Sequence, residues 1–259
     1  MSLPDFHERQ FVLATDLDGT FLGGTDEDRR QLYDWIEDNR DTVGLIFVSG
    51  RDPEFMVETC SSGDLPWPEY VIGDVGTTIA KVEDGDIRPI EALEQDISGR
   101  WSDSGDRVRT ALADAAGLRL QETPFRYRVS YHYDPASYDP AAADLIGDMG
   151  LDVLISDNRF FDVLPPGVSK GPSLLRLLDH LGVPQGRVLA SGDTLNDLSM
   201  LIAGTYAVAV GGSEQPLLQA LPQDEKIHRA KAIGAAGIAE AMTQFNLHPG
   251  SKEILKNVV

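Results

Sequence analysis

The chain has 259 residues, of which 42% are hydrophobic and 25% charged, so it can bury the core of one large domain or two smaller ones. A formal net charge of −20 argues against nucleic acid and anionic membranes as partners, because both are bound by basic surfaces. Cys60, the single cysteine, excludes an intramolecular disulfide, and neither an apolar run of about 18 residues nor a signal-like N-terminus is present. We therefore expect a soluble, cytoplasmic protein.

The first expected element is a buried strand over 11–14, and two carboxylates follow it in the segment Asp16-Leu17-Asp18-Gly19-Thr20. Ligand sites of α/β sheets form at the carboxyl ends of parallel strands. In isolation, Asp18-Gly19-Thr20 is equally typical of a turn in which Thr20 caps a helix. The later segments decide between these two interpretations.

A second apolar strand is expected over 45–48, and Ser49-Gly50-Arg51 follows it. Such an end can offer a hydroxyl and free backbone N–H groups to an anion. Further along, 77–82 and 87–90 flank an Asp-Gly turn and predict a β-hairpin.

The interval between Ser49 and Lys170 is far longer than one β-α connection, so it predicts an inserted domain. Its hydrophobic patterning indicates two helices and a hairpin, over 104–117, 140–149, and 151–155 with 160–164. We expect Pro165-Pro166-Gly167 to be the hinge back into the core.

The segment 125–133 alternates bulky and polar residues, which predicts a strand with one packed face and one polar face. The polar positions are Arg126, Arg128, Ser130 and His132. Arginine suits phosphate and sugar hydroxyls, so we predict that this face recognises the substrate above the catalytic mouth. The alternative is an ordinary solvated sheet face.

Two further motifs follow the insert. Lys170 stands just before a leucine-rich helix, where a lysine can supply a compact positive charge to a phosphate, although a lone lysine is more often solvated. A strand over 187–191 then ends in Gly192-Asp193-Thr194-Leu195-Asn196-Asp197. This segment adds two carboxylates and an amide to the same sheet edge.

Four carboxylates share one small volume if these strands are neighbours: Asp16, Asp18, Asp193 and Asp197. Two such charges about 4 Å apart repel by roughly 4 kcal/mol at an effective dielectric of about 20, so the cluster needs a counter-charge. Hard oxygen ligands favour Mg²⁺. Lys170 and the donors around Ser49 then suit a phosphate group.

In this order, the motifs resemble those of the haloacid dehalogenase-like phosphohydrolases, through residues 16–20, 49–50, 170 and 192–197. The resemblance implies an α/β fold with a Rossmann-like parallel-sheet core over 1–82 and 166–259. It also implies an inserted α+β cap domain over 83–165 that sets substrate specificity.

The resemblance further implies roles for single residues. Asp16 would be the nucleophile that forms an aspartyl-phosphate, and Asp18 the general acid and then the general base, with Lys170 as the third catalytic residue. The phosphate would be held by Ser49, Gly50, Lys170 and Asn196. The Mg²⁺ ligands would be Asp16, the Asp18 backbone carbonyl and Asp193, supported from behind by Asp197.

Within this superfamily, the place of the insert and the segment 118–131 resemble the sucrose-phosphatase-like branch. Asp74-Val75-Gly76-Thr77 is similar to the substrate-side loop of that branch. We expect the substrate to contact Arg51, Gly76 and Thr77 as well as the polar cap face. Gly19 and Ser49 depart from the Asn and Thr that plant and cyanobacterial sucrose phosphatases usually carry.

We therefore expect a Mg²⁺-dependent phosphatase of a disaccharide phosphate such as sucrose-6-phosphate, paired with a sugar-phosphate synthase. Phosphates of mannosylfructose, or of glucosyl- or mannosyl-glycerate and -glycerol, are alternative substrates. A phospho-signalling receiver also combines acidic residues, a hydroxyl and a lysine. Receivers, however, lack both the acid/base residue that Asp18 would provide and the long insert between the motifs. A non-catalytic phospho-ligand-binding protein is the remaining alternative, and both a monomer and a dimer stay open.

Overall fold

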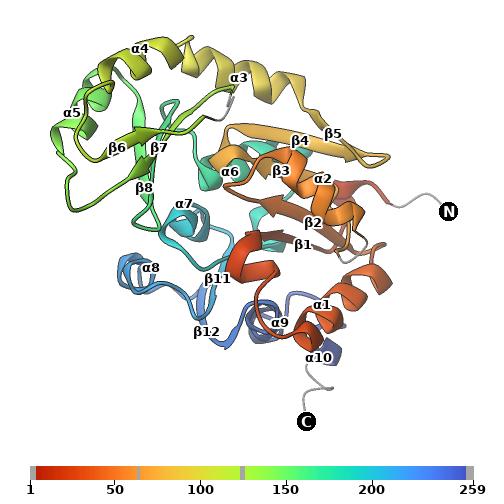
Figure 1. The fold of residues 1–259 in the computed structure, drawn as a ribbon. Helices are drawn as coiled ribbons and strands as arrows, with labels where there is room; N and C mark the ends of the chain where they lie inside the picture. Colours follow the sequence, from red (N-terminus) through yellow and green to blue (C-terminus); the bar gives the residue numbers. More distant parts are fainter. Residues whose placement is uncertain (1–3, 63–64, 123–125, 255–259) are drawn as a thin grey trace.

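The computed structural model describes residues 4–62, 65–122 and 126–254, which two sheets organise (Figure 1). In these residues the large sheet has eight strands, in the spatial order β12 (Ile227–Ile233), β11 (Tyr206–Gly211), β10 (Val188–Gly192), β1 (Phe11–Thr15), β2 (Val43–Val48), β3 (Tyr70–Gly73), β4 (Thr78–Glu83) and β5 (Asp86–Pro89). The strands from β12 to β3 pair in parallel, and β4 and β5 are antiparallel additions at one edge.

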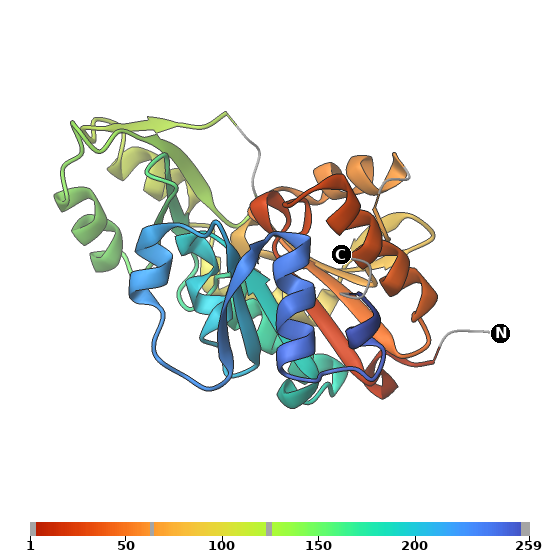
Figure 2. The same ribbon diagram turned by 90° about the horizontal axis from the view of Figure 1, so that it is seen from below.

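Helices cover both faces of the large sheet, because β1 and β2 are buried along their whole length and, apart from Thr15, carry no polar side chain. One face packs against α1 (Asp26–Asp38), α2 (Pro53–Ser61), α9 (Ala235–Gln244) and α10 (Ser251–Ile254). The other face packs against α3 (Glu91–Trp101), α6 (Lys170–Leu181), α7 (Leu198–Leu201) and α8 (Gln215–Ala220). Seen from below, α1 and α9 lie side by side (Figure 2). The result is a three-layer α/β core.

The small sheet is antiparallel, in the order β6 (Leu118–Leu120), β7 (Val129–Tyr133), β9 (Phe160–Leu164) and β8 (Asp152–Ser156). It packs against α4 (Gly105–Ala111) and α5 (Ala141–Asp148) around a separate hydrophobic cluster that includes Phe161. Helix α3 joins the two parts, because Ile97 packs in the core of the large sheet and Trp101 in the cluster of the small one.

Short helical turns connect several of these elements: η1 (Phe6–Glu8), η2 (Leu17–Phe21), η3 (Asp74–Gly76), η4 (Gln185–Arg187) and η5 (Leu195–Asp197). Three of them lie at the carboxyl ends of strands: η3 directly follows β3, η2 follows β1 after one residue, and η5 follows β10 after two. Along the described ranges, no helix is both long and apolar enough to cross a membrane.

Most expected elements agree with the structure to within one or two residues, and three expectations differ from it by more. The strand expected over 125–133 begins at Val129, and Phe125 lies outside the described residues. The helix expected over 104–117 ends at Ala111. The core boundary expected after residue 82 falls within β4, and β5 extends the large sheet to Pro89, because the hairpin pairs with β3 rather than with the insert.

Candidate active site

The site lies where neighbouring parallel strands end. β1 pairs with β10 on one side and with β2 on the other, so the residues that follow these three strands meet at one edge of the sheet. Asp16 directly follows β1, Ser49 follows β2 and Asp193 follows β10. The fold therefore brings these three polar side chains to the edge where α/β proteins bind ligands.

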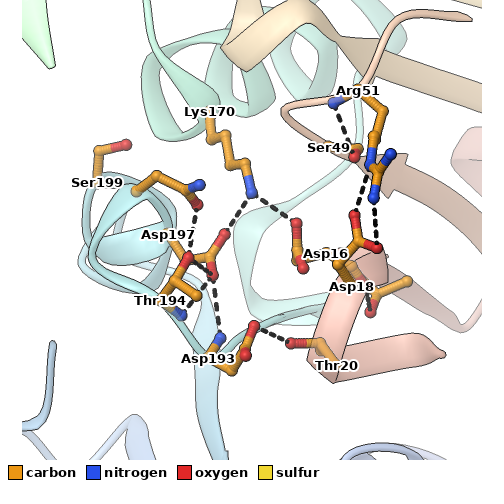
Figure 3. A network of polar contacts seen from close by, with 12 residues as sticks. Asp16, Asp18, Thr20, Ser49, Arg51, Lys170, Asp193, Thr194, Asp197 and Ser199 are labelled. Atoms are coloured by element: carbon orange, nitrogen blue, oxygen red, sulfur yellow. Dashed lines mark hydrogen bonds and ion pairs between the residues drawn. The ribbon is translucent and has the colours of Figure 1, made fainter. Parts of the chain in front are cut away.

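Lys170 joins two of the predicted carboxylates. Its Nζ donates hydrogen bonds to Oδ1 of Asp16 and Oδ1 of Asp197, both at 2.6 Å (Figure 3). Its side chain is 1% exposed. Burial lowers the pKa of Lys170, but the two carboxylates outweigh this effect and hold that pKa above its usual value. Lys170 is therefore a buried lysine whose two carboxylate partners favour its charged form, and not a solvated lysine.

The pKa of the Asp16 carboxyl group is also raised. Burial raises its pKa, Lys170 lowers it, and Asp197 and Asp193 raise it, with a net rise to about 8. The pKa of Asp193 is raised to about 6, by burial and by Asp197. One lysine thus leaves an excess of negative charge in a buried volume.

Hydrogen bonds fix the acidic residues. Oδ2 of Asp197 accepts from the backbone N–H groups of Asp193 and Thr194, both at 3.0 Å. Asp193 accepts from the hydroxyl of Thr20 at 2.9 Å. Gly19 has φ +79° and lies so close to Asp193 that a Cβ there would stand 2.3 Å from its Oδ2. In this arrangement, a side chain at position 19 would have to displace the Asp193 carboxylate.

These residues fit a divalent cation. Asp16, Asp193 and Asp197 each have a carboxylate oxygen within 4.8 Å of the others. The raised pKa values show the charge excess that such an ion would relieve. Both oxygens of Asp197 already accept protein hydrogen bonds, which makes Asp16 and Asp193 the freer ligands. An all-oxygen donor set of this kind suits Mg²⁺.

Asp18 and Arg51 lie at the mouth of the site. Arg51 Nε donates to Oδ2 of Asp18 at 2.9 Å, and Nη2 donates to Oδ1 at 3.1 Å. The side chain of Arg51 is 50% exposed and that of Asp18 is 55% exposed. The backbone N–H of Arg51 also donates to Oγ of buried Ser49 at 3.1 Å. Arg51, expected to contact the substrate, is here the partner of Asp18.

A cavity of about 600 Å³ connects these residues with the insert. Its lining from the large-sheet part comprises Asp16, Asp18, Ser49, Gly50, Arg51, Asp52, Val75, Thr194 and Asn196. Its lining from the insert comprises Gln121, Arg128, Ser156, Asp157, Arg159, Phe160 and Asp162. A cavity of this size suits a ligand larger than inorganic phosphate.

Most of the predicted polar cap face lies elsewhere. Arg128 lines the cavity, but Arg126 pairs with Glu94, and Ser130 donates a hydrogen bond to Asp162. His132 is exposed and lies beside Phe160, with ring centroids 6.4 Å apart.

The predicted loop residues Gly76 and Thr77 are buried behind the cavity. The carbonyl of Gly76 accepts from Ser173 at 2.6 Å, and the hydroxyl of Thr77 donates to the carbonyl of Asp74 at 3.0 Å. Among the described residues, neither lines the cavity, and their neighbour Val75 does.

The insert residues that sequence reasoning missed lie mainly at one hairpin end. Asp157 and Arg159 lie in the turn between β8 and β9, Ser156 is the last residue of β8 and Phe160 is the first residue of β9. Asp157 has φ 52°, so the backbone of this tight turn adopts the left-handed conformation that is common in β-hairpins. The hairpin itself was expected, and its Ser-Asp-Asn turn was the one available signal of an exposed polar tip.

A family model described as sucrose-6F-phosphate phosphohydrolase matches residues 9–246. The chain belongs to this family. Together with the sucrose-phosphatase-like structural match, this places it among the haloacid dehalogenase-like phosphatases and confirms the expected superfamily, α/β fold and enzyme class.

Solved and curated relatives agree with this family. The X-ray structure of the sucrose-phosphatase from Synechocystis sp. PCC6803, in complex with sucrose and phosphate, matches with a TM-score of 0.83 and 25% identity, covering 92% of this chain and 98% of that one. A mannosylfructose-phosphate phosphatase from Agrobacterium fabrum is 28% identical, over 92% of this chain and 98% of that protein.

A glucosylglycerol-phosphate synthase from Pseudomonas anguilliseptica is 38% identical over 235 residues, which cover 90% of this chain. The match spans only 30% of the length of that synthase. This chain is thus similar to one part of a much longer protein.

Proposed function

We propose that this phosphatase hydrolyses the phosphate monoester of a small glycoside, with Asp16 as nucleophile and Mg²⁺ as cofactor. The observation that carries the proposal is the buried contact between Lys170 and Asp16 at 2.6 Å, at the floor of a cavity that Asp18 and Ser49 also line. A carboxylate nucleophile, an acid/base and a fixed cation are the groups that phosphoryl transfer by way of a covalent intermediate requires.

The contacts assign a task to each group. Lys170 holds Oδ1 of Asp16, so we assign Oδ2 as the oxygen that attacks phosphorus. As the P–O bond to the sugar breaks, Asp18 gives a proton to the leaving oxygen. Water then attacks the phosphorus of the aspartyl-phosphate while Asp18 takes a proton from that water. The bond between phosphorus and Oδ2 of Asp16 breaks, which releases inorganic phosphate and restores the Asp16 carboxylate.

The phosphate oxygens need donors during both steps. The Ser49 hydroxyl, the Gly50 backbone N–H, Lys170 and the side-chain amide of Asn196 surround the position that we assign to them. Ser49, Gly50 and Asn196 line the cavity, whereas Lys170 reaches Asp16 from α6.

Asp16, Asp193 and the backbone carbonyl of Asp18 would hold Mg²⁺, with Asp197 fixing Lys170 and the backbone of Asp193. When bound, Mg²⁺ supplies charge neutralisation for the carboxylates and for the transferring phosphoryl oxygens.

The cavity volume of about 600 Å³ supports a substrate of disaccharide size. Sucrose-6-phosphate agrees with the family, and mannosylfructose phosphate with the Agrobacterium relative. The 38% identity to a glucosylglycerol-phosphate synthase favours glucosylglycerol phosphate as a second candidate. Each of these would be the product of a sugar-phosphate synthase, which we propose as the functional partner.

The test is phosphate release from these three glycoside phosphates and from simple hexose phosphates, with Mg²⁺ or EDTA, and with Asp16→Asn as the blank. We expect Mg²⁺-dependent release and a preference of at least about tenfold in kcat/KM for one glycoside phosphate, equivalent to roughly 1.4 kcal/mol. Equal, weak hydrolysis of all sugars would refute the glycoside proposal, and release that is unaffected by EDTA would refute the cofactor.

A further inference from the structure

The guanidinium group of Arg128 connects the insert to the large-sheet part. Arg128 immediately precedes β7 and is 6% exposed. Its Nη2 lies 3.3 Å from the carbonyl oxygen of Gly50 and 3.4 Å from Oδ1 of Asp74, both in the large-sheet part. Its Nη1 lies 3.5 Å from Oδ1 of Asp162, in strand β9 of the insert.

Arg128 is the shared counter-charge of two buried carboxylates. Burial raises the pKa of both Asp74 and Asp162, and the charge of Arg128 opposes that rise in each. Removing one partner from such a buried group leaves an uncompensated charge, so the contact strongly favours one relative placement of the two parts.

The loop that Arg128 contacts has an unusual backbone. Asp74 and Val75 both have positive φ, at 54° and 60°, and a β-branched residue rarely adopts this conformation. Gly76 follows at φ +105°, and a Cβ there would stand 2.5 Å from the carbonyl carbon of Ser169. Strained backbone of this kind persists only where surrounding contacts hold it, and it is concentrated at functional sites.

This loop in turn holds the backbone of the Ser49-Gly50-Arg51 segment. The N–H of Asp74 donates to the carbonyl of Arg51 at 2.9 Å, and the N–H of Val75 donates to the carbonyl of Ser49 at 3.2 Å. With the Arg128 contact to Gly50, all three carbonyl oxygens of this segment accept hydrogen bonds from Arg128 or the loop.

Arg51 completes the path to the reacting groups. Its guanidinium packs 4.4 Å from the ring centroid of Phe55 and donates two hydrogen bonds to the Asp18 carboxylate (Figure 3). The fork therefore fixes both the position and the rotation of that carboxylate. The backbone that carries this fork is the one that Arg128 and the loop hold.

We propose that Arg51 and Arg128 are positioning residues that act in series: Arg128 ties the insert to the Ser49-Gly50-Arg51 segment, and Arg51 places the Asp18 carboxylate. The inference rests on the proposed function, in which Asp18 is the acid/base. It also replaces the expectation that both arginines recognise the substrate.

The test is a double-mutant cycle with Arg51→Lys and Arg128→Lys, because lysine keeps the charge but lacks the planar fork. Since misplacing a reacting group by about 1 Å costs roughly 100-fold, we expect each variant to lower kcat about 10- to 100-fold with little change in KM. In series, the double variant should fall no further than the slower single variant. If the effects of the two substitutions on kcat multiplied in the double variant, the link between the two arginines would be overturned. A raised KM with unchanged kcat in the single variants would make the arginines substrate contacts.

Free guanidinium ion at a non-denaturing concentration should restore part of kcat to Arg51→Ala, since the Arg51 side chain is half exposed. Failure of this rescue would count against positioning through the fork. Arg109→Lys, an exposed arginine on α4, is the matched control in the insert and should keep wild-type kcat and KM.

Amide hydrogen exchange separates this inference from the proposed function, because it needs no substrate. In Arg128→Lys, exchange should rise in residues 49–52 and 74–78 and stay unchanged in Arg109→Lys. Unchanged exchange in Arg128→Lys would refute the link even in an active phosphatase. If the wild type hydrolysed no phosphate ester while exchange rose as expected, the proposed function would fail and the contact between the two parts would stand.

Discussion

The two halves of the cavity are built differently. The Asp16 half is buried, and its charged groups are tied by short contacts: Lys170 is 1% exposed and bonds two carboxylates at 2.6 Å. The hairpin half is open: the side chain of Arg159 is 72% exposed, and its ion pair with Asp157 is 3.7 Å long. The difference suits a site in which fixed groups perform the chemistry and adaptable ones select the sugar.

The largest effect should follow from Lys170→Met. This change leaves the buried carboxylates of Asp16 and Asp197 without their cation, so we expect a loss of about 3 to 5 kcal/mol in the free energy of unfolding, measured in EDTA. We also expect kcat to fall about 10³-fold. The control is Lys81→Met, which breaks an exposed pair with Glu83 and should leave the free energy of unfolding nearly unchanged. If both substitutions lowered the free energy of unfolding equally, the distinction between the buried and open halves would not hold.

A smaller effect should follow from Gly19→Ala. The new Cβ would collide with Asp193 and would require a backbone φ of +79° from an alanine. Displacing Asp193 should weaken Mg²⁺ binding about 10- to 100-fold, measured by isothermal titration calorimetry. Gly99→Ala, with nothing within 4 Å of the new Cβ, is the control and should bind Mg²⁺ like the wild type. Wild-type affinity for Mg²⁺ in Gly19→Ala would contradict the assignment of Asp193 as a metal ligand.

The pH dependence of stability should also come from the buried half. In the metal-free protein the pKa is raised to about 8 for Asp16 and about 6 for Asp193, from 3.8. A raised pKa stabilises the fold fully only below the unfolded value, and this contribution is lost as the pH rises through about 6 for Asp193 and about 8 for Asp16.

Mg²⁺ binds the deprotonated carboxylates, so it should raise Tm more above pH 8 than below pH 6. Thermal unfolding in Mg²⁺ and in EDTA across this range measures the difference. A shift in Tm that is constant, or that grows toward acid pH, would contradict the assignment of these two carboxylates as ligands.

The smallest effect should come from the open half. Arg159→Ala removes an exposed cation from the hairpin end, and the loss of one hydrogen bond of roughly 1.4 kcal/mol would raise KM for the preferred glycoside phosphate about tenfold. KM for p-nitrophenyl phosphate should change less, because that substrate carries no glycoside. Arg107→Ala, exposed on α4, is the control. An equal rise for both substrates would place Arg159 at the phosphate.

The buried half was predictable from the sequence because each of its residues is marked by the apolar strand directly before it. Asp16, Ser49 and Asp193 each follow an apolar strand, and parallel strands bring their carboxyl ends to one edge. The structure places these residues together as expected, and Lys170 with them. Their catalytic roles remain predictions.

The open half could not be predicted in the same way, because it depends on how the insert is placed. Alternation correctly put Ser130 and His132 on one face, but Ser130 is tied to Asp162, and the cavity meets the neighbouring hairpin end instead. The positive φ of Val75 is equally invisible in sequence, since valine disfavours it. The extension of the large sheet by β5 likewise depends on a pairing partner that its own residues do not specify.

The central claim, that Asp16 is the nucleophile, is tested most directly by rapid quenching of the reaction in acid followed by peptide mass spectrometry. The account predicts one phosphoryl group on the peptide that contains Asp16 in the wild type and none in Asp16→Asn, together with the loss of turnover in that variant. Sustained phosphate release by Asp16→Asn, or a phosphoryl group on another residue, would contradict it.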